Sequence, residues 1–187
     1  MGQRQDLLAG ARKCLAEKGY SRTTARDITA ASGANLAAIG YHFGSKEALL
    51  NAAVLESFDE WGNAIEEAMA VPYEGEPIDR LEGFLALFLA GSAEHRTTLV
   101  ASVQAFAEAE FVPEIRQQLA AAYDGARRGI AAMLLDVEPD RVRAEDLALG
   151  SLALAIISGI ALQLFIAPEP TPSARELAVA IKTLVHN

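Results

Sequence analysis

Apolar residues along the chain recur at steps of three and four, the spacing of one face of an α-helix. Leu8, Ala11 and Leu15 begin this pattern, and Gly19 ends the first predicted helix. Glycine, proline and capping residues divide the remainder into further helices. The predicted helices after the first cover residues 25–32, 36–43, 45–69, 78–90, 93–106, 113–133, 144–166 and 173–185. Strand-like alternation is absent from the sequence, so we expect an all-α protein with nine helices.

Residues 24–43 have the pattern of a helix-turn-helix. Thr24-Ala-Arg-Asp27 matches a capping box, in which the threonine and the third helical residue exchange hydrogen bonds with backbone amides. Gly33 ends the first short helix, and Asn35 is a good N-cap for the second. Two short helices joined by about three residues define this motif. Its expected core consists of Ile28, Ala31, Ile39 and Phe43, packed against Leu8, Ala11 and Leu15.

The charge distribution separates the beginning of the chain from the rest. The whole sequence has a net charge of -9, yet residues 1–50 carry seven basic and four acidic side chains. A basic segment on an acidic body favours contact between that segment and a polyanion. The candidate DNA contacts are basic or hydrogen-bonding residues, namely Thr24, Arg26, Tyr41, His42 and Lys46. A plain helical hairpin with solvated charges is the alternative, and spacing alone leaves both open.

Three segments of this region resemble the amino-terminal domain of the tetracycline-repressor family. They are Thr23-Thr-Ala-Arg-Asp-Ile28, Ser32-Gly33 and Ile39-Gly-Tyr-His-Phe-Gly-Ser-Lys-Glu-Ala-Leu49. The resemblance implies an all-α homodimer that binds a palindromic operator and releases it when a small molecule enters the carboxy-terminal domain. It divides the chain into a DNA-binding domain, residues 1–46, and a helical ligand-binding and dimerisation domain, residues 47–187.

The same resemblance assigns roles to individual residues in and just after the motif. Asn35, Leu36, Ala37 and Ala38 occupy the stretch that reads the major groove, and Arg26 resembles a base or phosphate contact. Tyr41, His42 and Lys46 resemble a clamp on phosphates. Gly40 departs from the family, which more usually has a larger side chain there. Glycine within a helix costs about 0.5–1 kcal/mol relative to alanine.

Residues 147–167 contain no charged side chain, and this length would suffice for a membrane span. Against that reading, Glu145, Asp146 and Glu169 flank the stretch and Gln163 lies inside it. The alternative is a soluble helix buried on nearly every side. Its small residues and the apolar face of the last helix predict a four-helix dimer core. The predicted interface consists of Ala148, Ser151, Ala155, Ser158, Leu162, Leu177, Ile181 and Leu184.

Aromatic residues gather in the middle of the chain, where they form either ordinary core or a pocket between helices for an apolar or amphipathic ligand. The candidate pocket residues are Phe58, Trp61, Phe84, Phe88, His95, Gln104, Phe106 and Tyr123.

An enzyme or a scaffold bundle, in which the helix-turn-helix is only structural, is the alternative class of function. The sequence has no metal-spaced His/Cys set, no nucleophile elbow and no glycine-rich phosphate loop. We therefore expect no catalytic residues, no metal and no cofactor. Cys14 lies on an apolar helix face and is expected to be a core residue. No secretory leader opens the sequence, so we expect a cytoplasmic bacterial protein that is nucleoid-associated when bound to DNA.

Overall fold

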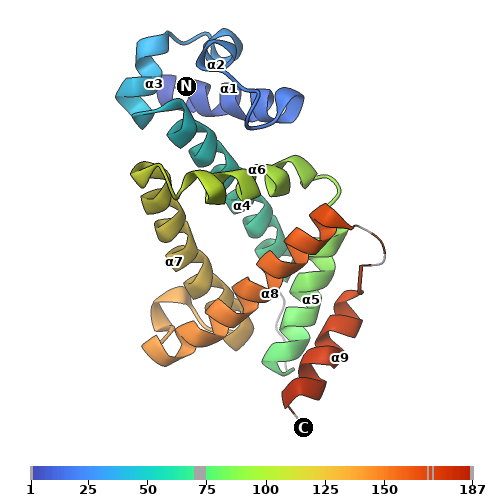
Figure 1. Ribbon diagram of the computed structural model, residues 1–187. Helices are drawn as coiled ribbons and strands as arrows, with labels where there is room; N and C mark the ends of the chain where they lie inside the picture. Colours follow the sequence, from blue (N-terminus) through green and yellow to red (C-terminus); the bar gives the residue numbers. More distant parts are fainter. Residues whose placement is uncertain (1, 70–74, 168, 170, 186–187) are drawn as a thin grey trace. The chain divides into compact units, whose positions relative to one another are not determined.

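The computed structural model describes residues 2–69, 75–167, 169 and 171–185 (Figure 1). Within these residues the fold is all-α and contains no strand. Its α-helices are α1 (Gln3–Lys18), α2 (Ala25–Ser32), α3 (Leu36–Phe43), α4 (Lys46–Met69), α5 (Pro77–Gly91), α6 (Arg96–Glu108), α7 (Pro113–Leu135), α8 (Leu147–Ile166) and α9 (Ala174–Val185). Two single 3₁₀ turns, η1 (Pro139–Arg141) and η2 (Ala144–Asp146), precede α8. Residues 71–74, in the first predicted break, and residues 168 and 170, in the second, lie outside the described residues.

Local capping explains why most predicted helix bounds agree with the structure. The Thr24 hydroxyl accepts a hydrogen bond from the Asp27 amide at 3.2 Å. The side-chain Oδ1 of Asn35 accepts one from the Ala38 amide at 2.9 Å, and the Ser45 hydroxyl accepts one from the Ala48 amide at 3.0 Å. Each bond satisfies an amide that the helix itself leaves without an acceptor. Two predicted starts are too early, because residues 92–95 form turns before α6 and residues 144–146 form η2.

The chain folds into two compact units, and both are discontinuous in sequence. The first unit contains Met1–Trp61 and Arg96–Ala122, and the second contains Gly62–His95 and Tyr123–Asn187. Helices α4 and α7 therefore contribute residues to both units. The division at residue 46/47 concerns functional domains and stays a prediction.

The first unit has a core that joins the helix-turn-helix to α1, α4 and α6. Leu7, Ile28 and Leu49 are fully buried in it. Ala101 and Ala105 of α6 belong to the same core. The expectation that Ala31 lies in this core is wrong, because Ala31 is exposed. Its place is taken by Ala38, which is 4% exposed.

Helix α1 crosses α2 closely at Gly10. A Cβ atom at Gly10 would lie 2.8 Å from the Ser32 Cβ and 3.0 Å from the Ile28 carbonyl oxygen. We expect Gly10→Ala to lower the free energy of unfolding by about 1–3 kcal/mol, because overpacking forces the two helices apart. Gly40→Ala is the control, since nothing lies within 4 Å of its new Cβ. It should raise stability by about 0.5–1 kcal/mol. Urea denaturation measures the free energy of unfolding of both variants. Equal changes in the two variants would contradict the close crossing of α1 and α2.

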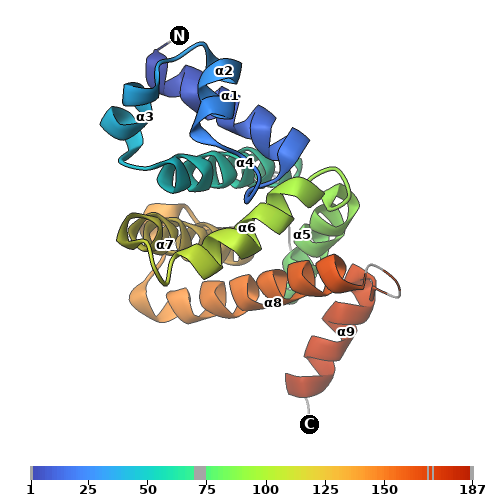
Figure 2. The same cartoon turned by 45° about the horizontal axis from the view of Figure 1, so that its top comes forward.

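The second unit is held together by α5, α7, α8 and α9. Helices α5 and α9 lie side by side in both views, and Lys182 Nζ of α9 lies 2.9 Å from Asp79 Oδ1 of α5 (Figures 1 and 2). Arg80 of α5, only 8% exposed, forms an ion pair with Asp136 just after α7. This pairing compensates the cost of burying the guanidinium.

Helix α8 is far less buried within one chain than the sequence predicts. Of its side chains, Ala153, Ile157 and Ile160 are buried, together with Gly150. Ala148 and Ala155 are exposed, Ser151 and Ser158 are half-buried, and Leu162 is 45% exposed. Burial on nearly every side is therefore wrong for the isolated chain. The segment Ala144–Ile166 is long and apolar enough to cross a membrane. Its most apolar 18-residue window has a mean hydropathy of 2.2, and 22% of that window is buried.

Candidate nucleic-acid interface

Helices α2 and α3 form a helix-turn-helix on α1. The turn uses Gly33 in the left-handed conformation, with φ 71°, and the Gly33 amide donates to the Thr29 carbonyl at 3.0 Å. Glycine adopts this conformation without steric cost, so the chain can leave α2 and enter α3 within three residues. Figure 2 shows α3 beside the amino-terminal end of α1, with its outer face away from the core.

The start of α2 is fixed by a network around Asp27. Its carboxylate accepts hydrogen bonds from the Thr24 amide at 2.9 Å and the Thr24 hydroxyl at 2.7 Å, which completes the predicted capping box. Lys18 Nζ lies 2.5 Å from the other carboxylate oxygen. The Lys18 ammonium, followed by the Thr24 donors, holds the pKa of Asp27 well below its usual range.

This network predicts a pH dependence of stability. Because the folded-state pKa of Asp27 is depressed, its contribution is present above the unfolded pKa of about 3.9 and is lost as pH falls through the folded value. We expect Asp27→Asn to lower the unfolding temperature at neutral pH, with a gap to wild type that narrows below about pH 4. Thermal unfolding followed by circular dichroism, from neutral pH to below about pH 4, measures this difference in unfolding temperature. Glu17→Gln, on an exposed position of α1, is the control and should show no such gap.

The amino-terminal half of α3 offers fewer groove-facing side chains than predicted. Leu36 is 56% exposed and Ala37 is exposed, so both are available to a ligand outside the protein. Ala38 is buried in the core and has no side-chain surface for a base, which corrects its assignment. Asn35 is exposed, but its carbonyl is engaged in capping α3.

The predicted phosphate contacts lie at the start of α2, at the end of α3 and at the start of α4. Tyr41 is 86% exposed, and Thr24 and Arg26 are exposed as well. The His42 ring meets the Tyr41 ring edge to face, with centroids 4.9 Å apart. Lys46 is held in place, because its Nζ donates to the Thr23 carbonyl at 3.1 Å and lies 3.1 Å from Glu47 Oε1.

Helix α6 belongs to the core of the helix-turn-helix, which was not predicted from the sequence. Gln104 of α6, predicted as a pocket residue, donates to the Ser21 hydroxyl at 3.3 Å, between α1 and α2. Nothing local in the sequence indicates this contact, because 83 residues separate the partners. Only the folded chain brings α6 against the motif.

The predicted pocket residues are divided between the two units. Phe58 and Trp61 stack in the first unit, with centroids 6.2 Å apart, and Phe106 there is 44% exposed. Phe84 and Phe88 stack in the second unit at 6.5 Å. His95 and Tyr123 are half-buried in the second unit. Their joint lining of a ligand site remains a prediction.

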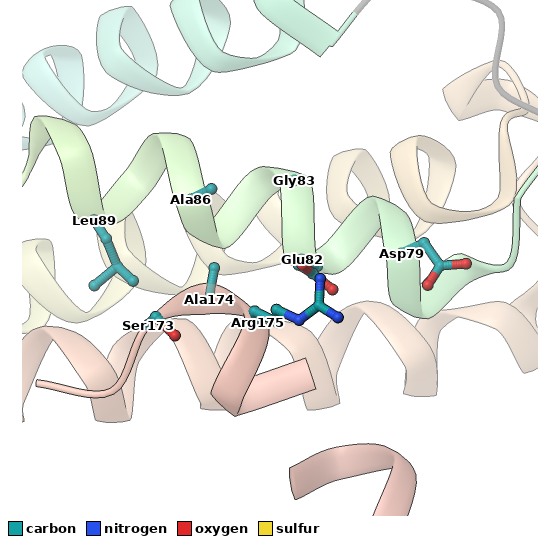
Figure 3. A pocket seen from close by; sticks show the side chains of 8 residues that line it. All are labelled: Asp79, Glu82, Gly83, Ala86, Leu89, Ser173, Ala174 and Arg175. Carbon is teal, nitrogen blue, oxygen red and sulfur yellow. The ribbon is translucent and has the colours of Figure 1, made fainter. Parts of the chain in front are cut away.

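The second unit has an open hollow of about 700 Å³ between α5 and the start of α9, shown in Figure 3. None of the predicted pocket residues lines it. The hollow exists because several of its lining residues are small, and charged side chains lie along its border. Its lining is Asp79, Glu82, Gly83, Ala86, Leu89, Ser173, Ala174 and Arg175.

Together, a capped helix-turn-helix with an exposed second helix and an all-helical second unit define a helix-turn-helix protein with an appended helical domain. Residues 7–53 match the family model of bacterial regulatory proteins of the tetR family. Residues 77–186, more than half of the chain, match the carboxy-terminal domain of BetI-type transcriptional repressors. The chain belongs to the tetracycline-repressor family.

Curated relatives match about a third of this chain. The HTH-type transcriptional repressor AcnR of Corynebacterium efficiens is 39% identical over 67 residues, which is 36% of each chain. AcnR of Corynebacterium glutamicum is 41% identical over 64 residues, 34% of each chain. The match thus spans about a third of these relatives' length.

Solved structures share the fold over nearly the whole chain. A transcriptional regulator from Rhodococcus sp. Rha1 has a TM-score of 0.70 at 19% identity, covering 98% of this chain and 96% of that one. A regulator from Saccharomonospora viridis, in complex with choline, has a TM-score of 0.66 at 22% identity. The match covers 98% of this chain and 95% of that one. The multidrug binding protein EbrR, complexed with proflavin, has a TM-score of 0.64 at 22% identity. The match covers 96% of this chain and 99% of EbrR.

Proposed function

We propose that this protein is a transcriptional repressor that binds a palindromic operator as a homodimer and leaves it when a small apolar or amphipathic ligand binds. The observation that carries the proposal is the outer face of α3. Leu36 and Tyr41 are 56% and 86% exposed on a short helix whose other face is buried in the core. A rigid helix that presents such side chains at its free face fits the major groove of DNA.

The phosphate clamp is the part most open to test. We expect Lys46→Ala and Tyr41→Phe to weaken binding about equally on all DNA sequences, and Lys46→Ala to reduce the salt slope by about 1. Leu36→Gln should instead change which sequence is preferred. The probe is a duplex selected by the purified protein from a random pool, and fluorescence anisotropy across a salt series measures affinity.

Lys13→Ala is the matched control, because Lys13 is exposed on α1 and lies outside the proposed contacts. Its affinity and salt slope should equal those of wild type. If the protein selects no preferred duplex from the random pool, the proposed function is wrong. The result would then favour a scaffold bundle in which the helix-turn-helix is only structural. Unchanged binding by Lys46→Ala alone would remove the clamp but not the function.

The homodimer is supported by apolar surface left open on α8 and α9. Leu152 and Ile166 of α8 are 59% and 78% exposed, and Leu184 of α9 is 83% exposed. Exposed apolar surface on this scale favours association with a second copy. A two-fold axis through this face would present two α3 helices to the two halves of a palindrome. The predicted residues Leu177 and Ile181 are half-buried on α9.

The class of effector is supported by the structural relatives with bound ligands. Choline joins a cationic group to apolar methyl groups, and proflavin is an amino-substituted aromatic. Both fit the expectation of a small amphipathic ligand. Release of the selected duplex on addition of either compound would support this part, and the sole tryptophan, Trp61, provides a fluorescence signal for binding. A cytoplasmic protein that associates with the nucleoid fits this function.

A further inference from the structure

Arg4, in the first turn of α1, lies against the carboxy-terminal end of α3. Its guanidinium carbon is 5.1 Å from the centroid of the Phe43 ring, the last residue of α3. Figures 1 and 2 both show the start of α1 next to α3. A guanidinium stacked on an aromatic face is held in orientation while its in-plane N–H groups stay available.

The ring under Arg4 continues the row of proposed DNA contacts. The Phe43 ring is 6.4 Å from the His42 ring, and the His42 ring is 4.9 Å from the exposed Tyr41 ring. Arg4 thus lies at the carboxy-terminal end of α3, beside Phe43. Tyr41 and His42, the two residues before Phe43, are proposed phosphate contacts, so the guanidinium is at the same end of α3 as these contacts.

Arg4 differs in its partners from three other basic residues of the first unit. Arg12 pairs with Glu60 and Glu56, Lys18 with Asp27, and Lys46 with Glu47. Among the described residues, no carboxylate forms an ion pair with Arg4, whose side chain is exposed. The nearby Asp6 points about 200° around α1 from Arg4, because successive residues turn by about 100°.

The positive end of α1 adds to this charge. Gly2 caps α1 without a side-chain acceptor, so the first amides of the helix have no side-chain partner at the cap beside Arg4, and Asp6 is the acidic residue of this first turn. An anion bound at this point would interact with the positive end of the α1 dipole and with the N–H groups of the Arg4 guanidinium.

We propose that Arg4 binds a phosphate of the operator backbone that flanks the groove entered by α3, and that Phe43 positions it. This inference rests on the proposed function. The guanidinium donates two parallel N–H bonds to phosphate oxygens, which is the geometry that arginine favours. Arg4 is a sequence-independent anchor that fixes how α3 enters the groove.

The test compares Arg4→Ala, Arg4→Lys and Lys13→Ala on the selected duplex. Lys13 is the matched control, because it removes one positive charge from the same helix about 14 Å further along. We expect Arg4→Ala to bind about 5–10-fold more weakly and to lower the salt slope by about 1. Arg4→Lys should recover part of the affinity, and Lys13→Ala should match wild type.

Phosphate ethylation interference gives the second readout. Ethylation of one phosphate in each half-site should weaken wild-type binding but have no effect on Arg4→Ala. Equal affinity, an equal salt slope or an unchanged ethylation pattern for Arg4→Ala would overturn the proposal. If Lys46→Ala still weakens binding in that case, the proposed function stands. If neither variant nor wild type distinguishes the selected duplex from random DNA, the proposed function itself fails.

Discussion

Gly150→Ala is expected to destabilise the second unit by about 3 kcal/mol or more, the upper end of what overpacking costs in a packed interior. A Cβ atom at Gly150 would lie 1.9 Å from the carbonyl oxygen of Arg127 and 2.9 Å from its carbonyl carbon. These atoms belong to the backbone of α7, so no side-chain rotation can relieve the contact. Helices α7 and α8 would have to separate, and the packing of Ala131, Ala132 and Val142 nearby would be lost.

Chemical denaturation followed by circular dichroism measures this effect. Gly125→Ala on α7 is the matched control, because nothing lies within 4 Å of the Cβ it would add. That variant should be about 0.5–1 kcal/mol more stable than wild type, since alanine favours a helix over glycine. A Gly150→Ala protein as stable as the Gly125→Ala protein would contradict the close approach of α7 and α8.

Leu162→Glu is expected to convert the protein to a monomer and to reduce operator affinity by about 100-fold or more, within the range that multivalent linkage supplies. Leu162 is 45% exposed on α8, on the face proposed to meet a second copy. A two-fold axis places the new carboxylate twice in the interface, where its desolvation has no compensating partner. A monomer then holds only one half-site, so the second contact is no longer intramolecular.

Sedimentation velocity gives the oligomeric state, and anisotropy on the selected duplex gives the affinity. Leu87→Glu is the control, because Leu87 is 36% exposed on α5, outside the proposed interface. It should remain dimeric and bind as wild type. A Leu162→Glu protein that sediments as a dimer would place the interface on another face.

The caps of α2, α3 and α4, which depend on residues three positions apart, were predicted correctly. The hydrogen bonds of Thr24, Asn35 and Ser45 to nearby amides define where α2, α3 and α4 begin. Such bonds form within one turn of helix and do not depend on the rest of the chain. The helix-turn-helix was therefore recognisable, and the family match over residues 7–53 agrees with it.

Side-chain burial within the short helices was predicted less well. Ala31 is exposed and Ala38 is buried, the reverse of their assigned roles. An eight-residue helix has only about two turns, so its apolar pattern does not define a unique buried face. Alanine gives little help, because one methyl group suits either environment.

The sequence by itself determined the helical class, the capped motif and the long uncharged stretch that became α8, because each is written in local spacing. Only the tertiary structure decided that α6 packs into the core of the DNA-binding motif and that Arg4 lies over Phe43. It also decided that the candidate aromatic residues are divided between two units. These features join residues tens of positions apart, and such pairs are selected by how whole helices pack rather than by any local pattern.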